Sequence, residues 1–181
     1  MKKLLLIAVI AVFTVPVNAQ FTKATLQATG LTCAMCSNAI DKALQKVPFI
    51  ETVKADIKNS AFHIAFKKDA DIEIDALKEA VEDAGFSIGS LQLTGNFSDT
   101  RIEKDQHLKI GKENFHFVSV HDHSLQGEKT ITVVDRNFVT AKEFKKQCAA
   151  TKMDCIQTGK AASCCMKDGM AEGERVYHVT I

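Results

Sequence analysis

The chain has 181 residues, of which 46% are hydrophobic and 25% are charged, and its formal net charge is +1. This composition is ordinary for a folded globular protein. A near-neutral chain has no bulk attraction for nucleic acid or for an anionic membrane surface, so neither class of partner is expected.

Residues 1–19 have the composition of a secretory signal peptide. Lys2 and Lys3 form a short basic start, an apolar run follows over 4–15, and the small residues of 17–19 fit a cleavage site. The apolar run is too short to span a membrane, and no second long run follows it. We therefore expect a periplasmic or secreted protein that does not insert into the membrane after cleavage.

Residues 20–93 show hydrophobic spacing typical of six short elements. The spacing predicts a strand over 21–29, a helix over 35–47, strands over 50–57 and 61–66, a helix over 75–84 and a strand over 86–93. Gly85 follows the second helix, where it is well placed as a C-cap. The order β-α-β-β-α-β is the ferredoxin-like arrangement, so an α+β fold is expected for this region.

Two thiols lie three residues apart between the first expected strand and the first expected helix, in Gly30-Leu31-Thr32-Cys33-Ala34-Met35-Cys36. A helix N-terminus favours anions, so thiolates form there more readily than in a free cysteine. Two thiolates at this spacing can close on one soft cation, because sulfur ligands select Cu(I), Hg(II) or Zn(II) over hard ions. Cys33 and Cys36 are therefore the main candidate metal ligands.

Residues 20–93 resemble the heavy-metal-associated domain found in copper chaperones, copper-transporting ATPases and the periplasmic mercury-binding protein. The family motif is Gly-Met-Thr-Cys-x-x-Cys, from which this chain departs at Leu31 alone, and a second signature is present as Gly85-Phe86. The resemblance implies that Cys33 and Cys36 bind the metal, with Leu31 under the loop and Phe86 covering it.

The resemblance also implies that the protein binds Cu(I) and passes it on by ligand exchange, without catalysing a reaction. Zinc-preferring relatives tend to carry an acidic residue where this chain has Thr32. Zn(II) also favours four ligands, whereas the motif offers two strong ones. Cu(I) is the expected ion, and Hg(II) and Zn(II) are the alternatives.

Two other interpretations of the thiol pair stay open. A Cys-x-x-Cys pair also serves thiol-disulfide redox chemistry, but the chain has no Trp, and both Ala34-Met35 and the element order differ from the thioredoxin pattern. Export also favours a structural disulfide, because exported proteins meet an oxidising compartment.

Residues 94–181 are expected to form a second, mostly-β domain, following a polar run that begins near Thr94. The pattern predicts strands over 107–110, 114–120 and 129–135, a helix from Ala141 to about Ala149, and a last strand over 174–181. Thr140 and Glu143 have the spacing of a capping box for that helix. Several strands with one helix loosely resemble an OB-like barrel.

Soft ligands are concentrated in residues 148–170. This segment holds Cys148, Cys155, Cys164 and Cys165 together with Met153, Met166 and Met170. One interpretation is a second metal site with His178 or His121 as nitrogen ligands. The other, favoured by the oxidising compartment, is one or two disulfides joining Cys148 or Cys155 to Cys164 or Cys165.

The remaining histidines are given structural roles. His121 and His123 lie near an expected turn and are interpreted as part of a solvated loop. His63 alternates with apolar neighbours on an expected strand, so it is expected to face away from the core.

The sequence as a whole predicts an exported soft-metal-binding protein, a Cu(I) chaperone or sequestration protein that acts through Cys33 and Cys36. Its partner would be a metal transporter or a cuproprotein acceptor. The second half shows no nucleophile motif and no phosphate-binding loop, so we do not expect an enzyme. An alternative is that the expected C-terminal barrel recognises a protein or a small ligand.

Overall fold

The structure is a computed structural model that describes residues 20–31, 34–120 and 122–181. The expected signal peptide, residues 1–19, lies outside these ranges. The elements in chain order are β1 (Gln20–Thr29), α1 (Ala34–Leu44), β2 (Ile50–Asp56), β3 (Ala61–Phe66), α2 (Ile74–Asp83), β4 (Ser87–Ile102), β5 (Gln106–Ile110), β6 (Glu113–Phe117), β7 (His123–Val133), α3 (Ala141–Ala150), α4 (Cys155–Thr158), the 3-10 helix η1 (Met166–Asp168) and β8 (Val176–Thr180). No helix in the described ranges is long and apolar enough to cross a membrane.

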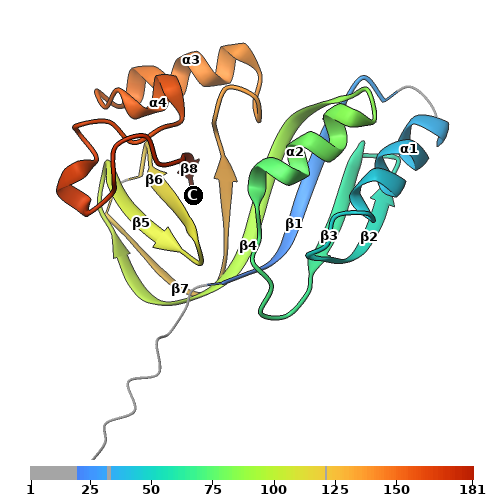
Figure 1. The fold of residues 1–181 in the computed structure, drawn as a ribbon, viewed down its shortest axis with the longest axis horizontal. Coiled ribbons are helices and arrows are strands. Elements are labelled where there is room, and N and C mark those ends of the chain that lie inside the picture. Colours follow the sequence, from blue (N-terminus) through green and yellow to red (C-terminus); the bar gives the residue numbers. More distant parts are fainter. Residues whose placement is uncertain (1–19, 32–33, 121) are drawn as a thin grey trace, which may run out of the picture.

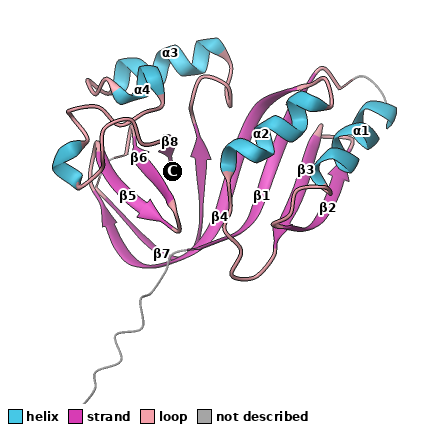
Figure 2. Cartoon of the chain, viewed as in Figure 1, coloured by secondary structure: helices cyan, strands magenta, loops and turns pink. Residues whose placement is uncertain are grey.

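All eight strands form one sheet in the order β2-β3-β1-β4-β7-β8-β6-β5. The first four strands of this row and helices α1 and α2 make up the N-terminal half, where both helices cover one face of the sheet (Figures 1 and 2). This half has the predicted β-α-β-β-α-β order, so the ferredoxin-like prediction for it is confirmed.

Periodic apolar side chains hold α2 on the sheet. Ile74, Leu77 and Val81 recur on one face of the helix and are completely buried. The helix ends where expected, because Gly85 adopts a φ of +87° and its N–H donates to the carbonyl of Glu82. The chain then enters β4.

Strand β4 joins the two halves of the molecule. It is 16 residues long, pairs with β1 from Ser87 to Asn96, and pairs with β7 from Leu91 to Ile102. A Cβ at Gly95 would lie 2.8 Å from the carbonyl oxygen of Gln20, so only glycine allows β1 to approach this closely. The expected domain boundary, between residues 93 and 94, falls inside this strand. The division into domains 20–93 and 94–181 stays a prediction.

The hydrophobic core also continues from one half to the other. Phe21 of β1 packs edge-on against Phe97 and Phe115, with ring centroids 6.2 and 5.4 Å away. All three rings belong to one cluster of buried residues that extends from Ile64 in the N-terminal half to Val179 in the C-terminal half. Edge-on aromatic pairs of this kind add to the free energy of burial.

The C-terminal half is a mixed sheet with helices. Strand β8 lies between β7, to which it is antiparallel, and β6, to which it is parallel. Within the described residues the row of strands ends at β2 and β5 and does not close. The OB-like barrel is therefore not confirmed. The predicted start of this helix is confirmed: Thr140 is the N-cap, and its hydroxyl accepts a hydrogen bond from the backbone N–H of Glu143.

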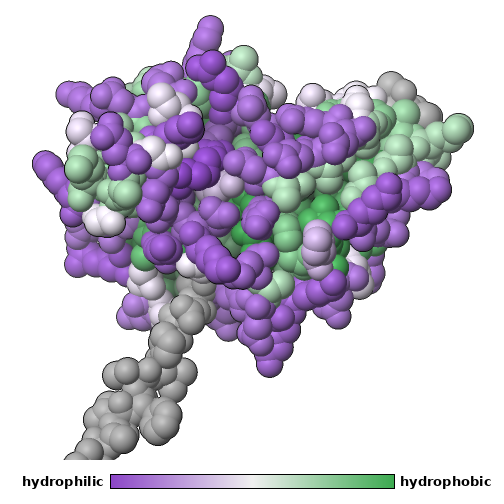
Figure 3. Space-filling model, viewed as in Figure 1, coloured by the Kyte–Doolittle hydropathy of each residue, from purple (hydrophilic) through white to green (hydrophobic). Residues whose placement is uncertain are grey.

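A shallow apolar groove runs between α1 and α2. Its floor is made of small side chains, including Ala39, Ala43, Ala76 and Ala80. Figure 3 shows the corresponding strip of apolar surface between rows of polar residues.

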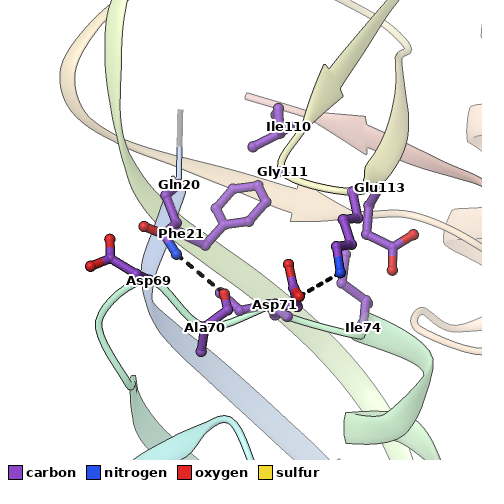
Figure 4. A pocket seen from close by; sticks show the side chains of 11 residues that line it. Gln20, Phe21, Asp69, Ala70, Asp71, Ile74, Ile110, Gly111 and Glu113 are labelled. Atoms are coloured by element: carbon purple, nitrogen blue, oxygen red, sulfur yellow. Dashed lines mark hydrogen bonds and ion pairs between the residues drawn. The ribbon is translucent and has the colours of Figure 1, made fainter. Parts of the chain in front are cut away.

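A cleft separates the α2 side of the N-terminal half from the β5–β6 hairpin (Figure 4). Lys112 bridges it with an ion pair to Asp71, and Gln20 donates to the carbonyl of Ala70 at 3.2 Å. Glu113 lines the same cleft and is half-buried. Burial raises the pKa of the Glu113 carboxyl, and the charge of Asp75 raises this pKa further.

Because the pKa of Glu113 is higher in the folded chain than in the unfolded chain, its charge opposes folding. The stabilising contribution of the protonated form is complete below about pH 4.5 and is lost as the pH rises through the folded-state pKa. We expect Glu113→Gln to raise the free energy of unfolding at pH 7 by about 0.5 to 1 kcal/mol, with no gain at pH 4. Denaturant unfolding at both pH values checks this. The exposed Glu172→Gln is the matched control, and an equal gain at both pH values would contradict the prediction.

Candidate functional site

The Cys-x-x-Cys motif follows β1 in the sequence and ends in the first turn of α1. Thr32 and Cys33 lie outside the described residues. Cys36 lies in the first turn of α1 and is half-buried, whereas Met35 beside it is 82% exposed. Cys36 therefore lies near the surface of the molecule, at the beginning of α1.

An aromatic ring lies beside the chain just after β1. Leu31 and Phe86 are half-buried and pack against the main hydrophobic core. A Cβ placed on Gly30 would lie 4.0 Å from Cδ1 of Phe86, which shows that the ring and this part of the chain are neighbours. The role of Phe86 as a cover over a bound metal stays a prediction.

The start of α1 suits an anionic sulfur. The backbone N–H groups of a first helical turn and the helix dipole stabilise negative charge. The first turn of α1, which the structure describes in full, contains no acidic residue that would oppose a thiolate. Ser37 follows Cys36 and is buried, so this turn is fixed against the core.

A second group of soft ligands lies in the C-terminal half. His107 on β5 is paired with His116 on β6, and His116 is paired with His178 on β8. Residues that pair across neighbouring strands point to the same face of a sheet, so the three imidazoles form one row. The ring centroids are 4.5 Å apart for His107 and His116, and 5.1 Å apart for His116 and His178.

Three thiols from the segment after α3 face this row. Sγ of Cys155 lies 3.3 Å from Nε2 of His178 and 3.6 Å from Nδ1 of His116. Sγ of Cys164 lies 3.6 Å from Sγ of Cys165, and the three sulfurs lie within 4.8 Å of one another. Cys155 and Cys165 are completely buried. We refer to these three cysteines and three histidines as the thiol-imidazole cluster.

Burial shifts the protonation equilibria in this cluster toward neutral forms. Desolvation lowers the pKa of His116 to about 4, and positive charge on His178 or His107 would act in the same direction. Desolvation likewise raises the pKa of the Cys155 thiol, with a further increase from Cys165. A neutral imidazole keeps a lone pair for a metal, and a buried thiol must lose its proton to bind one.

A chain of charged groups runs from the cluster to the N-terminal half. Nδ1 of His178 donates to Asp135 at 2.6 Å, and Arg175 donates to Asp135 and to Asp75 of α2, each at 3.0 Å. Burial disfavours the charge on Arg175, but the hydrogen bond that it donates to Asp75 and the charge of Asp135 outweigh burial and raise the pKa of Arg175. The guanidinium also lies 4.0 Å from the centre of the Tyr177 ring.

The structure brings together some of the residues that the sequence singled out. Cys155, Cys164, Cys165 and His178 meet in the cluster, and the structure holds these cysteines as free thiols. Cys148 is also free but packs elsewhere, beside Val118, Val134, Phe144 and Ile156.

The other histidines that the sequence singled out are His121, His123 and His63. His121 lies outside the described residues, and His123 is exposed at the start of β7. His63 is exposed on β3. His107 and His116 were not among the candidate ligands. Their only signal in the sequence is that each lies on a short strand, without any indication of which strands pair.

The sequence matches the model of the heavy-metal-associated domain over residues 25–87. The mercuric transport protein periplasmic component of Pseudomonas fluorescens is 34% identical over 86 residues, which are 48% of this chain and 93% of that protein. The chain belongs to the heavy-metal-associated domain family. This confirms the resemblance that the motif indicated, and the matched residues include the Cys-x-x-Cys motif and Phe86.

Copper proteins are also similar to this heavy-metal-associated domain. The copper chaperone CopZ of Staphylococcus haemolyticus is 25% identical over 59 residues, which are 33% of this chain and 85% of CopZ. A probable copper-transporting ATPase, HMA5 of Arabidopsis thaliana, is 28% identical over 75 residues, which are 41% of this chain and 7% of the ATPase. A solved copper-binding domain of the P-type ATPase HMA7 is 33% identical with a TM-score of 0.33, and the match covers 37% of this chain and 92% of that domain.

The contact between Arg175 and Asp75 ties the heavy-metal-associated domain to the rest of the chain. Burial alone would raise the pKa of Asp75, but the hydrogen bond and charge of Arg175 outweigh burial and hold this pKa below its usual value. We expect Arg175→Met to lower the free energy of unfolding by about 2 kcal/mol, because it removes the positive charge and the hydrogen bonds that Arg175 gives to Asp75 and Asp135. The midpoint of urea unfolding, with the slope unchanged, measures this loss.

Lys112→Met is the matched control for that experiment. Lys112 also links the two halves, through Asp71, but its side chain is 75% exposed. An exposed ion pair contributes little, so no resolvable change is expected. Equal losses in the two variants would contradict the special role of Arg175.

Proposed function

We propose that this protein is an exported soft-metal-binding protein that holds Cu(I) through Cys33 and Cys36 and either carries or sequesters it. The single observation that supports this most is the Cys-x-x-Cys motif that follows β1 and ends in the first turn of α1 in a heavy-metal-associated domain. Two thiolates at a helix N-terminus form a low-coordinate sulfur site, which suits a soft monovalent cation better than a hard one.

The cargo moves by exchange of ligands. A competing thiolate from an acceptor attacks the bound ion, one of the two cysteines leaves, and the ion passes across through a shared intermediate. No bond of a substrate is made or broken other than bonds to the metal, so we propose a carrier and not an enzyme. The acceptor would be a metal transporter or a cuproprotein with its own thiolate or methionine ligands. The exposed Met35 and the exposed end of α1 leave room for such an approach.

Export is part of the proposal. Residues 1–19 have the composition of a signal peptide, and the relatives at 34% identity carry the description periplasmic component. In that compartment the two thiols can oxidise to a disulfide. A bound metal occupies both sulfurs, so metal binding would also protect the pair from oxidation.

Hg(II) is the second candidate cargo. The mercuric transport proteins match over more residues and at higher identity than the copper chaperone does. Both ions accept two thiolates, so the ligand set alone does not separate them.

We expect Cys33→Ser and Cys36→Ser each to remove one equivalent of tightly bound Cu(I) from the full chain. The affinity of that site should fall by more than about 100-fold, because loss of a direct ligand exceeds the loss of an outer-shell partner. Competition with a chromophoric Cu(I) chelator under anaerobic conditions measures this. Cys148→Ser is the control, since this half-buried thiol lies apart from the other cysteines. Unchanged affinity in both motif variants would refute the proposal.

Growth of the source cells separates the two ions. Deleting the gene should increase sensitivity to copper salts and leave tolerance of mercury unchanged. Complementation by the Cys33→Ser gene should fail. Increased mercury sensitivity with unchanged copper tolerance would replace Cu(I) by Hg(II) in the proposal.

A further inference from the structure

The thiol-imidazole cluster has no part in the function proposed above. It lies in residues 107–178, outside the part of the chain that matches the family model. Cys155 is at its centre: the sulfur is in reach of His178 and His116 on one side and of Cys164 and Cys165 on the other.

The spacing of these atoms is that of ligands around one ion. On a tetrahedral Zn(II), a thiolate sulfur and an imidazole nitrogen lie about 3.6 Å apart, and two sulfurs lie about 3.8 Å apart. The two distances from Sγ of Cys155 to imidazole nitrogens are 3.3 and 3.6 Å, and the distance between the sulfurs of Cys164 and Cys165 is 3.6 Å. The side chains therefore need only small shifts to share a cation.

Two of the histidines have the carboxylate partner that metal-binding histidines usually have. Nδ1 of His178 lies 2.6 Å from Asp135, and Nδ1 of His107 lies 2.6 Å from Asp168. A carboxylate on one ring nitrogen fixes the tautomer and leaves the other nitrogen free to bind a metal. In both residues that other nitrogen is Nε2, and in His178 it points at the sulfur of Cys155.

Polar atoms in the cluster lack partners. Nε2 of His107 and Nε2 of His116 are buried and make no hydrogen bond, although the latter lies 3.3 Å from Asp105. The His116 side chain is fully buried, and that of His107 is 2% exposed. Burying imidazole nitrogens without partners costs free energy. Nε2 of His116 faces Asp105, but a bound ion could offset this cost at His107, which groups with His116 and Cys155 as possible ligands of one ion.

We propose that the thiol-imidazole cluster is a second metal site, in which Cys155 and His178 bind a Zn(II) or Cu(I) ion together with ligands drawn from Cys164, Cys165, His107 and His116. The donors are sulfur and imidazole nitrogen, which exclude hard ions such as Mg²⁺ and Ca²⁺. The two d10 ions differ in coordination number: Zn(II) would use four of these donors, and Cu(I) two or three.

The site differs from the Cys-x-x-Cys motif in its accessibility. Cys155, Cys165, His116 and His178 are buried, so an acceptor protein cannot reach the ion without opening the segment that carries the cysteines. A buried, closed set of ligands is typical of ions that stabilise a fold. We therefore expect the second ion to hold residues 155–165 against strands β6 and β8.

The test uses the full chain carrying Cys33→Ser and Cys36→Ser, so that the motif contributes no binding. We expect this parent, prepared anaerobically, to bind one equivalent of Zn(II) or of Cu(I) and to show the visible absorption of tetrahedral thiolate-bound Co(II) when Co(II) is the probe. Adding Cys155→Ala to this parent should abolish both the metal binding and the Co(II) absorption. Adding Cys148→Ser, a cysteine outside the cluster, should change neither.

Two results would overturn the proposal. One is that the parent binds none of the three ions, which would leave the cluster as hydrogen-bonded thiols and imidazoles. The other is a free-thiol count that shows a disulfide between Cys155 and Cys164 or Cys165 in the anaerobic protein. Because the motif cysteines are absent from this parent, neither result bears on the proposed Cu(I) carrier function.

A second variant and a second measurement distinguish the loss of a ligand from misfolding. Cys164 is half-buried, so Cys164→Ser tests a ligand with less risk to packing than Cys155→Ala. Binding to the native state alone raises the melting temperature, so Zn(II) should raise that of the parent and of Cys148→Ser. A folded Cys155→Ala or Cys164→Ser protein should show a smaller shift or none. If Zn(II) raised the melting temperature of both cysteine variants as much as that of the parent, the proposal would be overturned.

Discussion

The pairing of β4 on both of its edges is the constraint on which the rest of this structure depends. One edge completes the heavy-metal-associated domain through β1, and the other edge begins the C-terminal half through β7. Because a single strand serves both, the twist and register of one half are transmitted to the other. Phe21 reinforces this joint by packing against rings on both β4 and β6.

The two groups of cysteines are placed in opposite physical environments. Cys36 lies in the first turn of a helix beside the exposed Met35, where a partner can approach. Cys155 lies where burial raises the pKa of the thiol, so a metal must displace its proton there. The first environment favours exchange and the second favours retention, in line with the proposed carrier site and the proposed second metal site.

Local patterns predicted the N-terminal half well. There the spacing of Ala76, Leu77, Ala80 and Val81 indicated α2, because it depends on residues within a few positions of one another. In the C-terminal half, the spacing of Thr140 and Glu143 indicated the start of α3 for the same reason. The second part of β4 was missed, since Gly95, which β-strands disfavour, lies in a polar run that pairing with β7 nevertheless holds extended.

Long-range pairing accounts for what the sequence did not reveal in the C-terminal half. The histidine row depends on the register of β5, β6 and β8, and His116 and His178 are far apart in the chain. The barrel prediction failed to anticipate a parallel contact between β6 and β8, because strand direction is not encoded in hydrophobic spacing. The motif cysteines, in contrast, were found from seven consecutive residues.

The position of β8 has a consequence for how the chain assembles. It follows every other strand in the sequence, yet it lies between β7 and β6, so among the described strands the β5–β6 hairpin is paired with the rest of the sheet only through it. Contacts between such distant segments form slowly, because a long loop must close before they contribute. All strands of the heavy-metal-associated domain precede β5 in the chain, so this domain can order before β8 is available, whereas the hairpin waits for β8 to dock.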